Sequence, residues 1–300
     1  MKRWVWVAAI LIPLAGVLFL LLSQGEAYSV SADGFLAYAG RAAPEYSQTL
    51  LLKEGGWSLY KIAFKSRDSK IYGLLSVPDS AAERAGGQEA RVGAFILLGG
   101  NTVTKEGIQE RLGKDLNSLG FATLSLDQRG EGETGGRVPS MQDDYQTFLR
   151  GGEPVQHLMV RDALAAYDLL RGRNGIDPER IYVAGESMGG RIAAIAAGIE
   201  PGIAGDVLIS TSGYEFTLSP DQKLNRFLRS VSPDTYIGRI SPRPVVFIHS
   251  RNDPVVPYDM GRKLFEKAGE PKRFFTADVA EHSYIPEAMK GFLEQGVKGW

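Results

Sequence analysis

The segment GESMG, residues 185–189, carries the arrangement with the clearest chemical meaning in this sequence. It joins the apolar run IYVA to an alanine-rich run, so we expect a strand that passes directly into a helix. Glycine inside either element costs roughly 1 kcal/mol relative to alanine, so its presence needs a reason. A tight turn supplies that reason, because side chains at Gly185 and Gly189 would clash with the neighbouring helix and strand. Such a turn strains Ser187, exposes its hydroxyl and predicts a nucleophile.

The elements that must position this turn form a regular alternation of strands and helices. Apolar runs predict buried strands over residues 91–100, 121–130, 181–184, 206–210, 244–250 and 273–279. Helical spacing of apolar residues predicts helices near residues 108–119, 155–170, 258–268 and 286–295. This alternation requires crossover connections, and therefore a mostly parallel sheet with helices on both faces. The segments WSLYKIAFKS and KIYGLLSVP predict a β-hairpin that adds an antiparallel edge.

With a G-x-S-x-G motif on a strand-to-helix turn in this setting, the chain from about Trp57 to Trp300 resembles the α/β-hydrolase superfamily. The resemblance is to its serine esterase and prolyl-oligopeptidase-like branch. It implies the α/β-hydrolase fold, and it implies a serine, an acid and a histidine in that order along the chain. Ligands of such sheets bind at the carboxyl ends of the strands, so polar residues just past a strand are the candidates for the other two positions.

The histidine that the resemblance implies is His282, in VAEHSYIP beyond the last predicted strand. A serine hydroxyl needs a base to take its proton, and only His282 follows Ser187 at a suitable place. His157 precedes the serine within a helical pattern and is expected to be a packing or surface residue. His249 ends a strand, where we expect a buried, hydrogen-bonded histidine.

The acid is expected at Asp253, in IHSRNDPVVP just past the strand 244–250. It would accept a hydrogen bond from the histidine ring, fix its tautomer and stabilise the imidazolium. The alternative for Asp253 is an Asp-Pro turn in which the carboxylate only caps its own loop. Glu215 is the reserve candidate for the acid. Glu281 is expected to point elsewhere, and Asp259 lies in a predicted helix.

Stabilisation of the developing oxyanion needs two backbone N–H groups, each worth roughly 3 to 4 kcal/mol. We expect one from Met188, directly after the nucleophile, and the other from Asn101, with Thr102 in reserve. Many members of the superfamily have His-Gly where this chain has Gly99-Gly100, which leaves the backbone role of the loop intact.

The segment DQRGEGETGG, residues 127–136, resembles the D-x-R-G-x-G-x-S/T segment of the superfamily. We interpret Asp127 and Arg129 as an ion-paired turn that positions the active-site loops, without a catalytic role. A phosphate-binding loop is excluded here, because no G-K-[ST] follows the glycines and no helix starts directly after them.

The bulk composition excludes several classes of function. A formal net charge of -1 leaves no excess of basic residues to bind nucleic acid. The absence of cysteine excludes disulfides, thiolate metal sites and a cysteine nucleophile, and three histidines argue against a histidine-rich metal site. The expected mechanism needs no metal and no organic cofactor.

Residues 1–22 form a separate N-terminal feature. After Met1-Lys2-Arg3 the chain carries no charge for 19 residues, which is long enough for a helix to cross a hydrocarbon core of about 30 Å. The basic start favours a cytoplasmic N-terminus. We expect an uncleaved signal anchor, with a cleaved signal peptide as the alternative. The protein is then membrane-anchored with an extracytoplasmic catalytic domain, or secreted or periplasmic if the segment is cleaved.

These observations predict three parts: the N-terminal segment, a stalk or linker over residues 23–55 and a hydrolase domain over residues 56–300. Residues 213–240 are expected to form a small lid. The predicted function is hydrolysis of a carboxylic ester through an acyl-enzyme, on a small-molecule ester or acyl substrate. A peptidase, a thioesterase or lipase, and a catalytically inactive binding module remain as alternatives.

Overall fold

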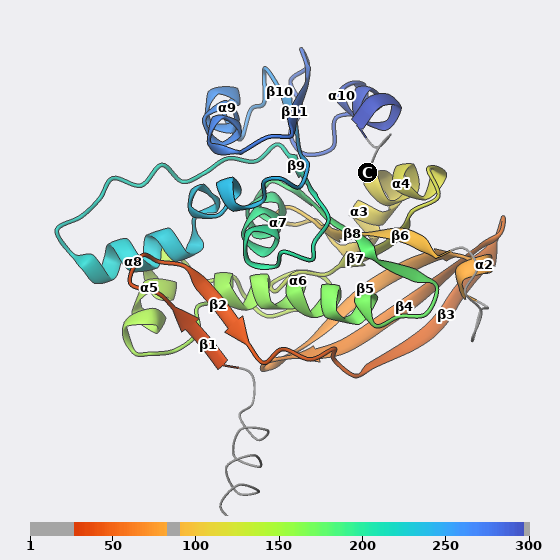
Figure 1. Ribbon diagram of the computed structural model, residues 1–300, viewed down its shortest axis with the longest axis horizontal. Helices are drawn as coiled ribbons and strands as arrows, with labels where there is room; N and C mark the ends of the chain where they lie inside the picture. Colours follow the sequence, from red (N-terminus) through yellow and green to blue (C-terminus); the bar gives the residue numbers. More distant parts are fainter. Residues whose placement is uncertain (1–26, 83–90, 297–300) are drawn as a thin grey trace, which may run out of the picture.

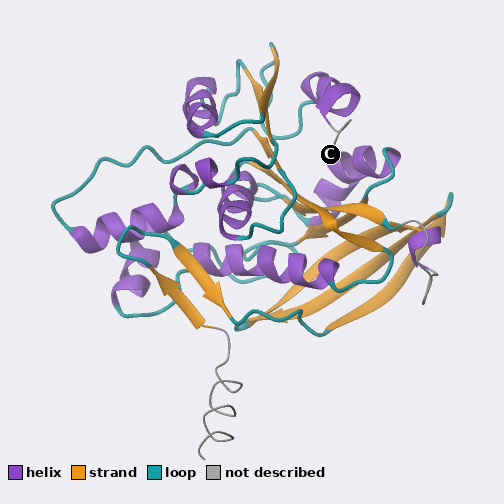
Figure 2. Cartoon of the chain, in the orientation of Figure 1, coloured by secondary structure: helices purple, strands orange, loops and turns teal. Residues whose placement is uncertain are grey.

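The computed structural model describes residues 27–82 and 91–296, and these form one large sheet with helices on both of its faces (Figures 1 and 2). The sheet has nine strands in the order β11-β10-β9-β8-β6-β7-β5-β4-β3. Neighbouring strands are parallel from β11 to β7 and antiparallel from β7 to β3. The predicted fold class is therefore confirmed. The predicted N-terminal hydrophobic helix, residues 1–22, lies outside the described residues, and no helix within them is long and apolar enough to cross a membrane.

The parallel half of the sheet contains the strands that the apolar runs predict. They are β6 (Val92–Leu98), β7 (Ala122–Leu126), β8 (Ile176–Glu186), β9 (Asp206–Ile209), β10 (Val245–Ser250) and β11 (Lys272–Ala277). The predicted hairpin forms β4 (Trp57–Ser66) and β5 (Ser69–Pro78), and a short helix α2 (Asp79–Ala82) follows it. Because parallel strands end at the same edge, the loops after β8, β10 and β11 meet there.

The helices form two layers, and each layer contains helices that the sequence predicts. One layer holds α6 (Val155–Arg171), α7 (Met188–Ile199) and α9 (Tyr258–Lys267). The other holds a continuous helical stretch, α3 (Lys105–Ile108), the π-helical turn η1 (Gln109–Gly113) and α4 (Lys114–Ser118), together with α10 (Pro286–Gly291) and its π-helical continuation η4 (Phe292–Gly296).

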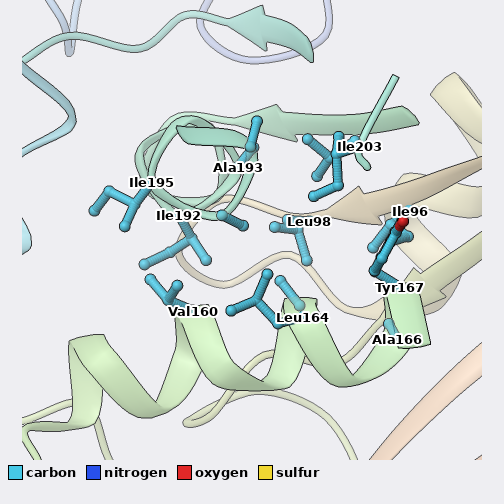
Figure 3. Packing of buried hydrophobic residues seen from close by; sticks show 14 of the residues in the cluster. Ile96, Leu98, Val160, Leu164, Ala166, Tyr167, Ile192, Ala193, Ile195 and Ile203 are labelled. Atoms are coloured by element: carbon cyan, nitrogen blue, oxygen red, sulfur yellow. The ribbon is translucent and has the colours of Figure 1, made fainter. Parts of the chain in front are cut away.

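Strand β6 shows why both layers are needed. Its side chains alternate between the two faces, so Ile96 and Leu98 pack toward α6 and α7, as Figure 3 shows, while Phe95 and Leu97 pack toward α3 and α4. All four are at most 1% exposed. Burial of a side chain of this size contributes roughly 1.5 to 3 kcal/mol, so the central strands are the most strongly held part of the sheet.

Residues 27–54, expected as a stalk, form three strands instead. β1 (Ala27–Val30) and β2 (Leu36–Ala39) make a hairpin whose Val30, Leu36 and Tyr38 are buried in the main core. β3 (Tyr46–Glu54) pairs with β4 as the outer strand of the nine-stranded sheet. The folded domain thus begins nearer the N-terminus than residue 56.

The connection over residues 213–240, expected as a lid, contains α8 (Gln222–Val231) and the 3₁₀ turns η2 (Pro233–Thr235) and η3 (Ile237–Arg239). α8 packs beside α5 (Met141–Leu149), a helix that the sequence analysis did not predict (Figure 1). The rings of Tyr145 and Phe227 lie 5.4 Å apart, and the Tyr145 hydroxyl donates a 2.7 Å hydrogen bond to Asp221. The helical part of this connection is therefore held against α5.

Candidate active site

Ser187 occupies a strained turn between β8 and α7. Its backbone has φ 53° and ψ −115°, a region that residues with a side chain rarely adopt. Two hydrogen bonds hold the backbone there: its N–H donates to the Ile209 carbonyl at 2.8 Å, and its carbonyl accepts from the Thr211 hydroxyl at 2.7 Å. The neighbouring strand β9 and the loop after it thus maintain the strain.

The glycines around the serine have the steric role that the sequence predicts. A Cβ on Gly185 would lie 2.3 Å from the Gly189 carbonyl oxygen at the start of α7. A Cβ on Gly189 would lie 2.1 Å from the Leu98 carbonyl oxygen at the end of β6. Both distances are far below van der Waals contact, so the close approach of β8, α7 and β6 requires glycine at both positions.

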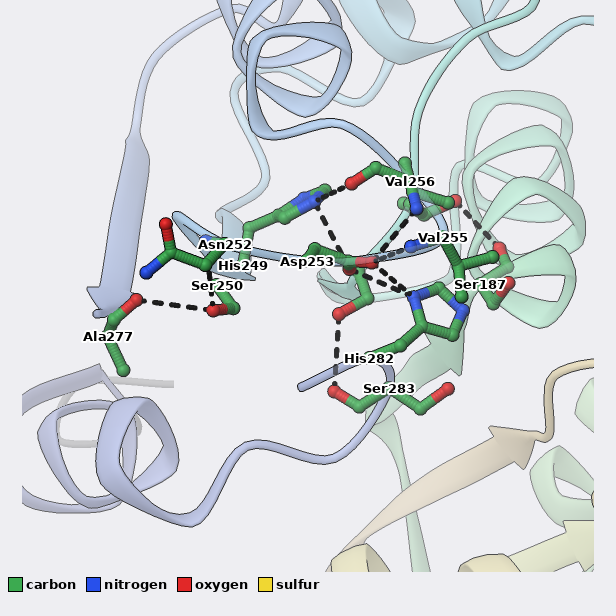
Figure 4. Close-up of polar contacts among 12 residues, drawn as sticks. Ser187, His249, Ser250, Asn252, Asp253, Val255, Val256, Ala277, His282 and Ser283 are labelled. Carbon is green, nitrogen blue, oxygen red and sulfur yellow. Dashed lines mark hydrogen bonds and ion pairs between the residues drawn. The ribbon is translucent and has the colours of Figure 1, made fainter. Parts of the chain in front are cut away.

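Asp253 and His282, from the loops after β10 and β11, form a hydrogen-bonded pair (Figure 4). The ring Nδ1 lies 2.9 Å from Asp253 Oδ2 and 3.0 Å from Oδ1. A carboxylate only accepts, so Nδ1 carries the proton and Nε2 has the free lone pair. The side chain of Asp253 is 0% exposed and that of His282 19% exposed, so the pair is sheltered but open on the histidine side.

The surroundings of Asp253 keep it ionised. Burial raises the pKa of this carboxyl, but the hydrogen bond from His282 and those from the N–H groups of Val255 and Val256 outweigh it and leave the pKa below its usual value. His249 Nε2 lies 3.5 Å from Asp253 Oδ2 and donates a 2.9 Å hydrogen bond to the Val256 carbonyl. Burial lowers the pKa of His249, so we treat this ring as a neutral side chain that packs against Asp253.

Figure 4 shows the imidazole of His282 between Asp253 on one side and Ser187 on the other. Within residues 27–82 and 91–296, neither the Ser187 hydroxyl nor His282 Nε2 has a hydrogen-bond partner. The lone pair that faces away from Asp253 is therefore available to accept a proton. In structures without a substrate, contacts between a nucleophile and its base are often longer than in the reacting complex.

The two expected oxyanion donors flank the serine. Met188 is the first residue of α7, and the first N–H groups of a helix have no partner within it. A Cβ on Gly100 would lie 3.2 Å from Ser187 Cβ, so the loop that carries Asn101 lies against Ser187. Among the described residues, no hydrogen bond uses the Asn101 N–H. The N–H of Thr102, the reserve donor, is 2.8 Å from Glu131 and is already used.

The other acids and histidines considered from the sequence have different partners. Glu215 forms a 2.9 Å ion pair with Lys263, and Glu281 and Asp259 are exposed. Among the described contacts, none of these three acids touches His282. His157 is fully buried, with its two ring nitrogens bonded to the hydroxyls of Tyr28 and Ser230.

Asp127 and Arg129 form a saturated polar turn after β7. Asp127 accepts hydrogen bonds from the N–H and the ammonium of Lys105, both at 2.8 Å. Arg129 binds both carboxylate oxygens of Asp162, at 2.7 and 3.2 Å, and one of Asp68 at 2.7 Å. These contacts fix the loop after β7 relative to the β4–β5 turn and to helices α3 and α6, in line with the expected positioning role.

Two contributors to the site were not identified from the sequence. Thr211 holds the Ser187 carbonyl from the loop after β9. Glu186, the residue before Ser187, is fully buried and pairs with Arg111 at 3.1 Å. The signal for Glu186 was present, since a carboxylate at the end of an apolar strand must find a partner. Within the described residues there is no group of three acids or histidines that could hold a metal ion.

Comparisons with known proteins agree with this geometry. The profile of the family described as serine aminopeptidase, S33 matches residues 92–243, which include Ser187. The protein YfhR of Escherichia coli O157:H7 is 33% identical over 146 residues, 46% of this chain and 51% of YfhR, so the match spans about half of that relative. The protein MT2364 of Mycobacterium tuberculosis is 26% identical over 288 residues, 93% of this chain and 90% of the relative.

Among solved structures, an acetyl xylan esterase from Paenibacillus sp. R4 has a TM-score of 0.67 at 19% identity, covering 84% of this chain and 88% of its own. That similarity concerns the fold. Together with the family profile, it identifies the architecture around Ser187. The chain belongs to the serine aminopeptidase S33 family of the α/β-hydrolase superfamily.

Proposed function

We propose that this serine hydrolase cleaves carboxylic esters through an acyl-enzyme, with Ser187 as nucleophile, His282 as base and acid, and Asp253 as the residue that orients His282. The observation that supports this most directly is the buried carboxylate of Asp253, 2.9 Å from the ring Nδ1 of His282, beside a strained serine. The hydrogen bond leaves Nε2 as the proton acceptor, which is the tautomer that serine activation needs.

In the proposed reaction, His282 Nε2 takes the proton of Ser187 as Oγ attacks the acyl carbonyl. The N–H groups of Met188 and Asn101 donate to the oxyanion that forms. His282 then gives its proton to the leaving alcohol, and the acyl group stays on Ser187. Water, deprotonated by His282, attacks the acyl-enzyme, and the second tetrahedral intermediate collapses to release the acid and restore the serine.

An ester is the first choice of substrate, and an aminoacyl amide is the second. The acetyl xylan esterase with the similar fold acts on an ester, as its name says, whereas the family description names an aminopeptidase. A thioesterase and a catalytically inactive binding module are the remaining alternatives. Chromogenic esters of increasing chain length, assayed beside aminoacyl p-nitroanilides, distinguish the two main candidates. A preference for the anilides would overturn the esterase assignment.

Labelling with a fluorophosphonate probe tests the nucleophile itself. We expect the folded protein to be labelled and Ser187→Ala to be unlabelled, with ester hydrolysis reduced by about 10⁴- to 10⁶-fold. Ser283→Ala is a matched control, since it removes a neighbouring hydroxyl from the loop that carries His282, and it should remain labelled. Absence of labelling in folded wild-type protein would favour the binding module.

For location, we propose that residues 1–22 tether the hydrolase domain to a membrane, on its extracytoplasmic side. The support is the uncharged run of 19 residues behind two basic ones. The mass of the mature protein tests this. A mass that includes residues 1–22 supports the tether, and a mass that lacks them supports a cleaved signal peptide and a secreted or periplasmic enzyme.

A further inference from the structure

Glu186 is a buried carboxylate directly before the nucleophile. Its side chain is 0% exposed, and it comes from the last position of β8. One carboxylate oxygen, Oε2, accepts a 3.1 Å hydrogen bond from Arg111. The other, Oε1, is buried and has no hydrogen-bond partner within residues 27–82 and 91–296. Such a group costs stability, and replacing it with an apolar residue would remove that cost, so its position calls for a functional explanation.

Arg111 connects this carboxylate to the loop that carries His282. It lies on the π-helical turn η1, and turns of this type are frequent at functional sites. Its guanidinium lies over the ring of Tyr284, 5.9 Å from the ring centre. Tyr284 is two residues beyond His282, and its hydroxyl donates a 2.5 Å hydrogen bond to Asp115. Arg111 thus joins three segments: the turn at Ser187, the π-helical turn η1 and the loop that carries His282.

The charges of this cluster reach the imidazole. Burial leaves the pKa of Glu186 above its usual value, although the charges of Arg111 and His282 each lower it. The negative charge of Glu186 also contributes to the raised pKa of Tyr284, behind burial and Asp115. Electrostatic coupling is mutual, so a histidine charge that favours ionised Glu186 is itself favoured by Glu186.

The groups around His282 come from several elements. Asp253 and the neutral His249 belong to β10 and the loop after it, and Glu186 belongs to β8. Arg111 and Asp115 belong to the helical stretch over η1 and α4, and Glu281 is exposed on the histidine's own loop. Of these four carboxylates, Asp253 and Glu186 are buried, whereas Asp115 is half-buried and Glu281 is exposed.

We propose that Glu186 is a positioning residue for the reaction described above, held by Arg111 so that its charge stabilises the imidazolium of His282. This inference rests on the proposed function. The proton still moves from Ser187 Oγ to His282 Nε2 and on to the leaving group, and Glu186 exchanges none. Its carboxylate adds a second negative charge, besides that of Asp253, at the moment when His282 becomes positive.

Glu186→Gln tests the proposal, because it keeps the shape and an acceptor for Arg111 but removes the charge. With p-nitrophenyl acetate we expect kcat to fall by about 10- to 50-fold with KM unchanged, as for an electrostatic contribution made only in the transition state. The acid-side midpoint of the kcat/KM profile should move to lower pH by about half to one unit, because the imidazolium loses a stabilising charge.

Glu110→Gln is the matched control. It removes a carboxylate from the same π-helical turn, at a side chain 64% exposed, and should leave kcat and the midpoint unchanged. Arg111→Met is a second test of the Glu186–Arg111 pair. It changes the more exposed residue of the two, whose side chain is 38% exposed. Without Arg111 the buried Glu186 takes up a proton, so this variant should shift the midpoint in the same direction as Glu186→Gln.

The outcomes separate this inference from the proposed function. If wild-type protein is not labelled at Ser187, both are overturned. If it is labelled, but Glu186→Gln keeps the wild-type kcat and midpoint, only the role of Glu186 is overturned. A fall in kcat with an unmoved midpoint would also overturn it, because it would indicate a purely structural contribution.

Discussion

Two groups of loops at the carboxyl edge of the sheet carry polar side chains, and they differ in how many of their hydrogen-bonding groups have a partner. In the loop after β7, Arg129 donates to Asp162, Asp68 and the Ser66 carbonyl. In the loops after β8 and β11, the Ser187 hydroxyl and His282 Nε2 have no partner within the described part of the chain. A saturated group is held in place, whereas an unsaturated one beside a base can react.

Lack of a partner alone does not make a group reactive. Both carboxylate oxygens of Asp206, at the amino end of β9, are buried and have no hydrogen-bond partner among the described residues. Burial raises the pKa of this carboxyl well above its usual value, against the lowering effect of the charge of Arg243. Asp206 lies at the opposite edge of the sheet from Ser187, at the first position of β9. What distinguishes Ser187 is the combination of strain, an oriented histidine and helical N–H groups.

To test this comparison, the largest fall in activity is expected from Asp253→Asn. The amide oxygen can still accept from the N–H groups of Val255 and Val256, but the NH₂ group cannot accept from His282 Nδ1. The ring then favours the wrong tautomer, and we expect kcat for ester hydrolysis to fall by about 10⁴-fold.

Thermal unfolding monitored by circular dichroism should show Asp253→Asn folded like the wild type. Asp259→Asn, a change of the same kind at an exposed position on α9, should keep full activity. Retention of wild-type kcat by Asp253→Asn would show that the aspartate only caps its loop.

The reverse pattern is expected for Arg129→Met in the saturated loop. Removal of the arginine leaves Asp162 buried without its partner, and breaking a buried pair in this way costs about 3 to 5 kcal/mol. Urea denaturation should report this loss, while kcat per folded molecule stays near the wild-type value. Arg137→Met, at an exposed arginine in the same loop, should change neither. A large fall in kcat without a fall in stability would place Arg129 among the reacting groups.

A smaller, pH-dependent effect is expected at His157. Burial lowers its pKa to about 3, against about 6.5 in an unfolded chain. Below about pH 6.5 the unfolded state binds a proton that the folded state excludes, so this residue reduces stability as the pH falls, by about 1.4 kcal/mol per unit, until the pH reaches its folded-state pKa. Above about pH 6.5 it has no effect.

His157→Gln removes this contribution, so its unfolding free energy should fall less steeply than that of the wild type between pH 6 and pH 4. Urea denaturation across that range measures both slopes. Equal slopes for the two proteins would contradict the prediction. They would mean that His157 gains a proton in the folded protein, as a solvent-exposed histidine does.

The sequence predicted the parallel half of the sheet well, because its strands are continuous apolar runs such as FILL in β6. It did not predict β3, because all nine residues of that strand are exposed and its apolar residues follow no period of two. It also missed α5, which is mostly polar and is preceded by the N-cap residue Ser140, whose side chain accepts from the Asp143 N–H.

For the site, the local motif was sufficient to predict roles for Ser187 and Met188, which are neighbours in the chain. The Asp253–His282 pair joins residues 29 positions apart, and it was anticipated through the superfamily resemblance. The Arg111–Glu186 pair spans 75 positions and has no local pattern, so only the folded structure brings it into view. Contacts between distant loops depend on the sheet order, which residue periodicity does not specify.

The order of the strands also determines how activity is lost on warming. Ser187 follows β8, which has β6 and β9 on its two sides, whereas His282 follows β11, an outer strand that pairs only with β10. Outer strands open in local fluctuations that cost less than global unfolding. Release of β11 would take the imidazole away while leaving the serine turn folded. Inactivation should therefore precede melting, and reclosure of one six-residue strand should restore the enzyme.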